Sequence, residues 1–297
     1  MLAPFLWMTL SRLSPSKVNF LLNILGRRED GYHELETVMY PIALCDLLHF
    51  KRAGQGIQLT CSDPRLGTGP DNLVFRAAES YLRAANLPEG VQIHLEKKIP
   101  IAAGLGGGSG NAATTLLALN EIFSGALTPL QITQIAETLG SDVPFFLQSK
   151  PALATGRGER IKPLDFFPAL HEVSLVLIHP GFGISTAWAY QQLSRFPGAA
   201  NGQPGRAAEL VSRLQCGDLH LAGAHFYNSL EAPVLPKYPL LALFQTFLRN
   251  HGALAALMSG SGSTTFALLK EKSAAESALE KFKQHFGESC WNAVVEL

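Results

Sequence analysis

The chain has 297 residues, which is the length of two average domains or of one large domain. Lys plus Arg and Asp plus Glu number 24 each, so the net charge is zero and argues against a general nucleic-acid binder, which needs a basic face. Only 16% of the residues are charged and 47% are hydrophobic, so the chain can bury a sizeable core and is not expected to be disordered.

The cysteines and the chain start indicate an intracellular protein. Cys45, Cys61, Cys216 and Cys290 form no CxxC pair, which argues against a disulfide framework or a zinc site and favours a reducing compartment. No segment reaches the ~18 uninterrupted apolar residues of a membrane span. The opening MLAPFLWMTL lacks the basic region and cleavage site of a signal peptide, and we interpret it as a lead-in to the first strand, with Met8 an alternative start.

The first half of the chain contains several strong secondary-structure patterns. Residues 17–25 alternate as a strand, and Asp30-Gly31 marks a tight turn before expected strands at 35–44 and 47–52. Asp71 is the expected N-cap of an amphipathic helix over 74–85. The further expected elements are a strand at 91–97 and helices at 111–123 and 129–139, the last ended by Gly140.

The second half mixes strands and loops without a strict βαβ rhythm. We expect a strand-turn-strand unit at 152–164, a buried strand at 173–178, and an exposed loop at 198–205. Residues 253–259 lead into a glycine-rich turn, then a helix and a final strand. The fold class is therefore α+β with two domains, which we place at residues 1–160 and 161–297.

Residues 100–110, PIAAGLGGGSG, form the most informative segment. They follow a predicted strand and lead into a predicted helix, so backbone N–H groups should face an anion at the positive end of the helix dipole. Five glycines in seven residues make a plain flexible turn the weaker interpretation. No Lys follows the glycines as a Walker loop requires, and Ser109 stands where a dinucleotide fingerprint has its third glycine.

Three motifs resemble those of the GHMP family of small-molecule kinases. The glycine segment is similar to the second family motif, P-x-x-x-G-L-G-S/G-S/G-S-x-x-A. Pro15-Ser16-Lys17-Val18-Asn19 resembles the first motif, and Ser259-Gly260-Ser261-Gly262 with Thr264 resembles the third. The three motifs occur in the same order as in the family and span nearly the whole chain. The resemblance implies a two-domain kinase with ATP and acceptor in a cleft between the domains.

Four strings point to one subgroup of that family. They are PSKVNFLLNILGRREDGYHEL, GLGGGSGNAATTLLALN, LGSDVPFFL and HPGFGISTAWAY, and the subgroup that they resemble phosphorylates the 2-hydroxyl of a cytidine diphosphate methylerythritol in isoprenoid precursor synthesis. The departures are Ser16 for Ala, Gly110 for a second Ser, and Ser141 for Ala. The missing hydroxyl at position 110 puts in doubt only a secondary phosphate or metal contact.

The resemblance implies a base and a cationic partner for the transfer. Asp142 matches the base that accepts the hydroxyl proton, and a lysine at position 17 would favour the alkoxide. From residue type alone, an N-cap before Pro144 is the better explanation of Asp142, and a solvated lysine on a strand is the better explanation of Lys17. The family resemblance reverses both preferences, and Asp142 could serve in both roles. Whether the two side chains meet is not readable from the sequence.

The resemblance also implies where the donor and acceptor bind. ATP with Mg²⁺ would be held by the glycine segment, with Asn72 and Lys97 near the adenine and Ser109 either a metal contact or a helix cap. The predicted ATP-binding set is Pro100, Ala103, Gly104, Leu105, Gly106, Gly107, Gly108, Ser109, Gly110, Asn72 and Lys97.

A cytosine ring is best held between aromatic faces, with hydrogen bonds along its edge. Tyr32 and Tyr190 match the aromatic pair, although both are also explained as packing residues, and His33 matches the edge contact. The complete predicted acceptor set is Asn19, Tyr32, His33, Thr186, Tyr190, Gly260 and Gly262. His179 before Pro180 is interpreted as a turn residue.

Other functions remain open at this level. One is a homoserine-type or mevalonate-type kinase of the same family, and another is a catalytically silent ATP-binding sensor. A nicotinamide-dependent oxidoreductase is argued against by the missing third glycine and acid. The expected partner is a small molecule, with no nucleic acid or membrane, in a monomer or homodimer of the cytoplasm, or of the plastid stroma in a plant.

Overall fold

The computed structural model describes residues 9–297, so residues 1–8 of the predicted lead-in and the alternative start at Met8 lie outside the described residues. The chain forms two compact units that interleave along the sequence. The first unit comprises residues up to Ser16, Leu44–Ile101 and Gly107–Ser149; the second comprises Lys17–Ala43, Ala102–Gly106 and Lys150–Leu297. The domain boundary at residue 160 stays a prediction. Within residues 9–297, no helix has the length and apolarity that a membrane span requires.

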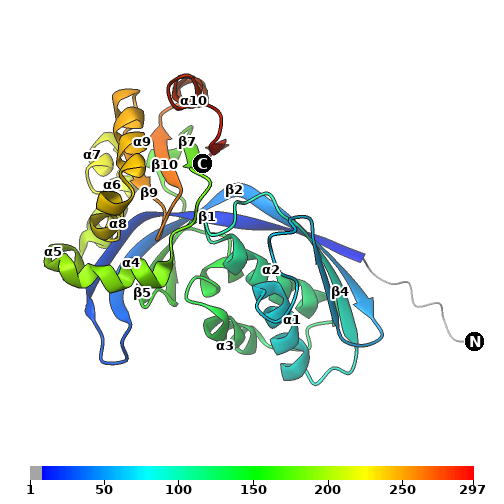
Figure 1. Ribbon diagram of the computed structural model, residues 1–297. Coiled ribbons are helices and arrows are strands. Elements are labelled where there is room, and N and C mark those ends of the chain that lie inside the picture. Colours follow the sequence, from blue (N-terminus) through cyan, green and yellow to red (C-terminus); the bar gives the residue numbers. More distant parts are fainter. Residues whose placement is uncertain (1–8) are drawn as a thin grey trace, which may run out of the picture. The chain divides into compact units, whose positions relative to one another are not determined.

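Each of two long strands, labelled in Figure 1, contributes residues to both units. They are β1 (Thr9–Arg27) and β2 (His33–Ala53). The predicted turn joins them, with Gly31 at φ 85° and its N–H donating to the Arg28 carbonyl at 3.1 Å. The two strands predicted at 35–44 and 47–52 are one continuous strand, β2, which corrects that expectation.

The first unit contains three helices and part of a β-sheet. β3 (Ile57–Cys61) runs parallel to β4 (Gly90–Glu96), and β4 is antiparallel to the second half of β2. Figure 1 shows α1, α2 and α3 grouped together, and the three contact one another. Their bounds are Leu73–Ala84 for α1, Gly107–Ile122 for α2 and Pro129–Leu139 for α3, with a 3₁₀ turn η1 at Pro144–Leu147.

Two helix starts differ from the sequence prediction. The N-cap of α1 is Asn72, whose side chain accepts from the Val74 N–H, and not Asp71. Helix α2 begins at Gly107, four residues before the predicted start at 111. Helix α3 has the predicted bounds, because Thr128 and Gln131 form a reciprocal capping box at its start and Gly140 ends it.

The second unit contains two sets of strands. The predicted strand-turn-strand unit is β5 (Ala152–Gly156) with β6 (Arg160–Pro163), and β5 pairs with the first half of β2. The short β8 (Tyr227–Asn228) runs parallel to β1. A separate four-stranded sheet has the order β11-β7-β10-β9. Its strands are β7 (Ser174–His179), β9 (Ala255–Met258), β10 (Thr265–Leu269) and β11 (Trp291–Glu296).

Most helices of the second unit were not predicted from the sequence. The segment expected to be a loop at 198–205 begins inside α5, and the Gly202 N–H donates to the Ile24 carbonyl at 2.7 Å, so this segment is attached to β1. The helices are α4 (Thr186–Gln192), α5 (Pro197–Ala200), α6 (Arg206–Gln215), α7 (Leu219–Gly223), α8 (Glu231–Lys237), α9 (Pro239–Asn250) and α10 (Lys272–Phe286), with 3₁₀ turns η2 (Pro168–Leu170) and η3 (Leu193–Arg195).

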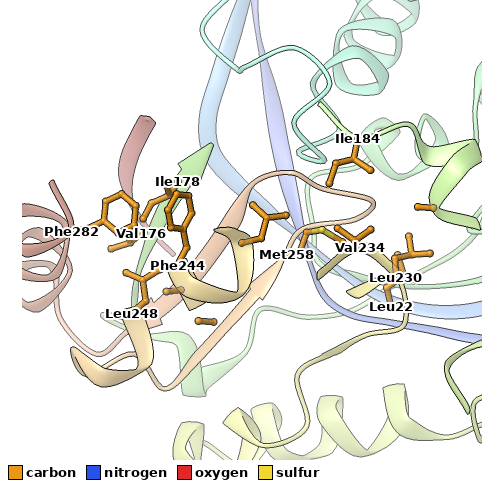
Figure 2. Close-up of a cluster of buried hydrophobic side chains, with 14 of the residues drawn as sticks. Leu22, Val176, Ile178, Ile184, Leu230, Val234, Phe244, Leu248, Met258 and Phe282 are labelled. Atoms are coloured by element: carbon orange, nitrogen blue, oxygen red, sulfur yellow. The ribbon is translucent and has the colours of Figure 1, made fainter. Parts of the chain in front are cut away.

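A continuous hydrophobic core organises the second unit (Figure 2). Helix α9 contacts β9 and β10, while α10 contacts β7 and β10. At the centre, Phe244 of α9 and Phe282 of α10 meet edge to face at 4.8 Å between ring centroids. The same cluster continues to Met258, Leu230 and Leu22, so the end of β9, the start of α8 and β1 share one core.

Candidate functional site

The glycine segment forms a tight loop that ends at the first turn of α2. Gly104 and Gly106 have φ values of +78° and +70°, a conformation that glycine adopts without steric cost. The first four N–H groups of a helix have no partner four residues back, and they carry the positive end of its dipole. Gly108 is exposed in this turn and Ser109 is half-buried. This arrangement is suited to binding an anion.

A buried ion pair lies beside the same turn. Asp46 is fully buried, and it pairs with Lys97, whose side chain is 6% exposed. A Cβ atom added to Gly107 would lie 3.2 Å from Lys97 Nζ, so the amine lies against the start of α2. Asp46 also accepts from the N–H groups of Lys98 at 2.7 Å and Ile99 at 2.9 Å. The Asp46 carboxylate therefore connects β2 to the backbone after β4 and, through the Lys97 ammonium, to the start of α2.

The side chains predicted near the adenine both have partners within the fold. Lys97 is held by Asp46, as described above. Asn72 uses both ends of its amide, accepting from the Val74 N–H at 2.8 Å and donating to the Gly67 carbonyl at 2.7 Å. Their contact with a nucleotide stays a prediction.

Two of the departures from the family motifs have a local explanation. Gly110 is buried, and a Cβ atom there would lie 2.5 Å from the Pro15 carbonyl oxygen, so a serine at this position would collide with β1. Gly110 is a close-packing position in this chain. The Ser16 hydroxyl donates to the Leu44 carbonyl at 2.7 Å, which gives this serine a bond that an alanine lacks.

The second unit brings four predicted residues to one point. The Lys17 ammonium donates to Asn19 Oδ1 at 2.5 Å, and both side chains are almost fully buried. A Cβ atom on Gly260 would lie 3.4 Å from both Lys17 Nζ and Asn19 Oδ1, and 3.2 Å from the Gly104 carbonyl oxygen. Asn19 donates in turn to Thr37 Oγ1 at 2.9 Å, which fixes the orientation of its amide.

The loop residues of the second and third motifs are joined by hydrogen bonds. The Ser259 hydroxyl donates to the Gly104 carbonyl at 2.9 Å, and the Thr264 N–H donates to the Ala103 carbonyl at 3.1 Å. The Leu105 carbonyl accepts from the Lys17 N–H at 2.9 Å. A side chain on Gly104 would lie 2.1 Å from the Ser259 carbonyl oxygen, so the close approach of these loops requires glycine.

The predicted acceptor rings make two contacts, one between His33 and Tyr190 and one between Tyr32 and Arg157. The rings of His33 and Tyr190 lie 5.2 Å apart, whereas the guanidinium of Arg157 lies 4.7 Å above the ring of Tyr32, which is 55% exposed. Burial, and secondarily the positive charge of Arg27, lowers the pKa of His33. A neutral imidazole has one donor and one acceptor nitrogen, which suits the edge of a base.

The third motif also reaches α4. Thr186 Oγ1 and Ser261 Oγ lie 2.8 Å apart at a surface-exposed point. Gly262 is buried, and a Cβ atom there would lie 2.5 Å from Met258 Sδ and 3.0 Å from Ile184 Cδ1. Gly262 is therefore required for packing, while the hydroxyl of Thr186 is accessible to a ligand.

Asp142 is half-buried and lies in the first unit, just before η1. The N-cap position of η1 is Val143, which forms no side-chain capping bond, and the role of Asp142 as the base stays a prediction. Lys17 belongs to the second unit, and a meeting of the two side chains stays a prediction. Within residues 9–297, no cluster of three or more His, Cys, Asp or Glu side chains is arranged to hold a metal ion.

Sequence reasoning missed several residues that organise the site. Asp46 has a recognisable signal, since it is an acid within the apolar strand ALCDLLHF. Asn111 donates to both Asp46 Oδ2 and Ser14 Oγ at 2.9 Å, inside a helix that the sequence did predict. Arg157 carries no comparable signal, because its importance follows from its tertiary contact with Tyr32.

Comparison with protein families gives two matches. Residues 72–150 match the description "GHMP kinases N terminal domain", and residues 198–288 match "GHMP kinases C terminal".

Full-length relatives agree with these matches. The 4-diphosphocytidyl-2-C-methyl-D-erythritol kinase of Pelotomaculum thermopropionicum is 41% identical over 278 residues, covering 93% of this chain and 95% of the relative. The protein of the same name from Synechococcus elongatus is 42% identical, covering 93% and 91%.

Solved structures show the same fold. A crystal structure described as 4-(cytidine 5'-diphospho)-2C-methyl-D-erythritol kinase has a TM-score of 0.77 and 35% identity, covering 97% of this chain and all of that one. A homoserine kinase from Cytophaga hutchinsonii has a TM-score of 0.74 at 19% identity, covering 100% of this chain and 97% of that one, which supports the fold alone.

Proposed function

The chain belongs to the GHMP kinase family, and on that basis we propose that it transfers the γ-phosphate of ATP to the 2-hydroxyl of 4-diphosphocytidyl-2-C-methyl-D-erythritol. Relatives with this activity in their names are about 40% identical over more than nine-tenths of their length. The structural observation that carries the proposal is the placement of the Lys17 ammonium, the Asn19 amide and Gly260 at one point. A buried cation there can stabilise the negative charge of an acceptor oxygen.

The triphosphate is bound by backbone N–H groups. The first turn of α2 presents these groups, and its glycines allow the phosphates to approach closely. Mg²⁺, when bound, neutralises charge on the triphosphate, and it commonly takes most of its ligands from phosphate and water oxygens. The half-buried Ser109 hydroxyl in this turn is the proposed protein contact.

The chemical step is a direct in-line displacement without a covalent enzyme intermediate. Asp142 accepts the proton of the attacking hydroxyl, and the Lys17 ammonium stabilises the oxygen as that proton leaves. Asn19, whose amide is fixed by Thr37, orients the acceptor.

The cytidine end of the acceptor binds at the aromatic residues. In this proposal Tyr32 and Tyr190 stack on the base. His33, which lies against Tyr190 and whose pKa is lowered by burial, donates to and accepts from the edge of the base as a neutral ring. Thr186 contacts the diphosphate with its accessible hydroxyl. The proposed state is a monomer or homodimer. The four free cysteines are compatible with a reducing compartment such as the cytoplasm or, in a plant, the plastid stroma.

The test is ADP release from Mg-ATP with the cytidylyl acceptor, beside homoserine, mevalonate and galactose. Turnover with the cytidylyl acceptor alone, with a 2-phosphate product by phosphorus NMR, is the expected result. Turnover only with another alcohol would refute the assigned substrate, and inactivity with all four in a protein that still binds ATP would favour the catalytically silent sensor.

The base is tested separately. Asp142→Asn should bind ATP normally and lose about 10²- to 10⁴-fold in turnover, while the surface variant Asp165→Asn serves as a matched control. A variant with the turnover of the wild type would exclude Asp142 as the base.

A further inference from the structure

A buried asparagine outside the three motifs controls the position of Gly260. Asn228 lies in β8 and is 2% exposed. Its Nδ2 donates to two backbone carbonyls, those of Met258 and Gly260, each at 2.8 Å. Its Oδ1 accepts from the Leu230 N–H at 2.9 Å. All the polar groups of this side chain are therefore used, and two of its three bonds are to the segment that carries the third motif.

The carbonyls that Asn228 binds lie on either side of Ser259. Gly260 has a φ of +56°, and the turn closes with a bond from the Gly262 N–H to the Ser259 carbonyl at 2.9 Å. Because Gly260 lies against Lys17 Nζ and Asn19 Oδ1, a small shift of its backbone changes the space around the ammonium. Asn228 fixes this backbone from the buried side.

Asn228 is itself anchored to the strand that carries the lysine. In the parallel pairing of β8 with β1, Asn228 lies opposite Leu22. Its neighbour Ser229 donates its N–H to the Leu22 carbonyl at 2.8 Å and accepts at Oγ from the Ile24 N–H at 3.0 Å. The neighbouring residues Leu22, Leu230 and Met258 belong to the hydrophobic cluster of this unit (Figure 2).

We propose that Asn228 is a positioning residue for phosphoryl transfer, because its amide fixes the Gly260 backbone at the distance from Lys17 that the reaction requires. This inference rests on the proposed function of Lys17. It predicts that loss of the amide donors lowers turnover of the folded enzyme, beyond any effect on stability.

The central variants are Asn228→Ala and Asn228→Asp, with Ser229→Ala as the matched control. Ser229 is also fully buried and is the next residue in the chain, but its hydroxyl bonds to β1 and not to the motif. All three variants should lower the unfolding temperature. Only the Asn228 variants should lower kcat, by about 10- to 100-fold with the ATP KM unchanged, because small misplacements of reacting groups have effects of this size.

A pH profile separates positioning from general damage. The carboxylate of Asn228→Asp faces two carbonyl oxygens, and burial raises its pKa, so protonation on lowering the pH restores one donor. As the pH is lowered from about 8 to about 6, the kcat of Asn228→Asp divided by that of the wild type should therefore rise. The same kcat ratio for Asn228→Ala should not change with pH. The proposal would be overturned if the kcat ratio to wild type were independent of pH in both Asn228 variants. It would also be overturned if the Asn228 variants and Ser229→Ala had equal kcat.

Hydrogen exchange at the Gly262 N–H gives a readout that does not depend on turnover. It should be faster in both Asn228 variants and unchanged in Ser229→Ala, and equal exchange in all three would also overturn the proposal. If the wild type fails to phosphorylate the cytidylyl acceptor, the proposed function fails, while the exchange result still decides whether Asn228 fixes the turn.

Discussion

The Asp46–Lys97 pair offers a quantitative test of how the start of α2 is held. In Asp46→Asn, the Lys97 ammonium would remain buried without its counter-charge. The carboxylate also accepts from the N–H groups of Lys98 and Ile99 and from the Asn111 amide, at 2.7–2.9 Å. Removing one partner of a buried ion pair typically destabilises a protein by about 3–5 kcal/mol, and we expect a loss in this range.

The partner variant should behave differently. Lys97→Met leaves an aspartate that keeps its backbone and amide donors, so we expect a loss of about 1–3 kcal/mol. The double variant should be less destabilised than the sum of the single variants, with a coupling of about 1–3 kcal/mol. The exposed pair Lys150–Asp165 provides the control, in which Asp165→Asn should change stability by less than about 1 kcal/mol.

The assay is urea unfolding followed by circular dichroism, in parallel with measurement of the ATP KM. A rise in the ATP KM of the single variants would connect the pair to nucleotide binding. An Asp46→Asn variant no less stable than Asp165→Asn, or a coupling near zero, would refute the conclusion that this pair holds the start of α2.

Three further outcomes follow from single contacts. Gly110→Ser should lose about 1–3 kcal/mol of stability without gaining ATP affinity, because its Cβ would collide with the backbone of β1; a variant as stable as wild type by thermal unfolding would contradict this. Arg157→Lys should raise the KM of the acceptor a few-fold, because the planar guanidinium covers the ring of Tyr32. Arg160→Lys is the control and should leave this KM unchanged, although both arginines lie near the Glu159 carboxylate. Equal acceptor KM values in the two variants would exclude a role of Arg157 in acceptor binding. Burial lowers the pKa of His179, so the unfolded state binds more protons than the folded state, and the free energy of unfolding should fall as the pH drops below about 6.5. In His179→Gln this pH dependence should be weaker, which urea unfolding at several pH values would show.

Local patterns were sufficient for much of the fold. The alternation of residues 17–25 and 91–97 correctly indicated strands, and Gly140 correctly marked the end of α3. The early start of α2 was missed because glycines have low helix propensity, and tertiary contacts such as that of Gly110 with β1 override it. At α1 the sequence offers two adjacent capping residues, and only the structure shows that Asn72 forms the cap.

The candidate site was predictable where a motif is contiguous. The glycine loop and its junction with a helix could be identified from residues 100–110 alone. The approach of Gly260 to Lys17, and the bonds from Asn228, join segments that are distant in the sequence, so no local pattern contains them. The stacking of Arg157 on Tyr32 depends on the pairing of β2 with β5, which is also a long-range event.

The interleaving of the two units constrains how this chain could be divided. A fragment that starts at Lys150 lacks residues 17–43 and 102–106, which are part of its own compact unit. In such a fragment β5 and β8 lose their partners in β2 and β1, and unpaired strand edges promote aggregation. The chain therefore resists separation into two independently folding halves at any one cut, and its two halves could not readily be exchanged with those of another protein as separate modules.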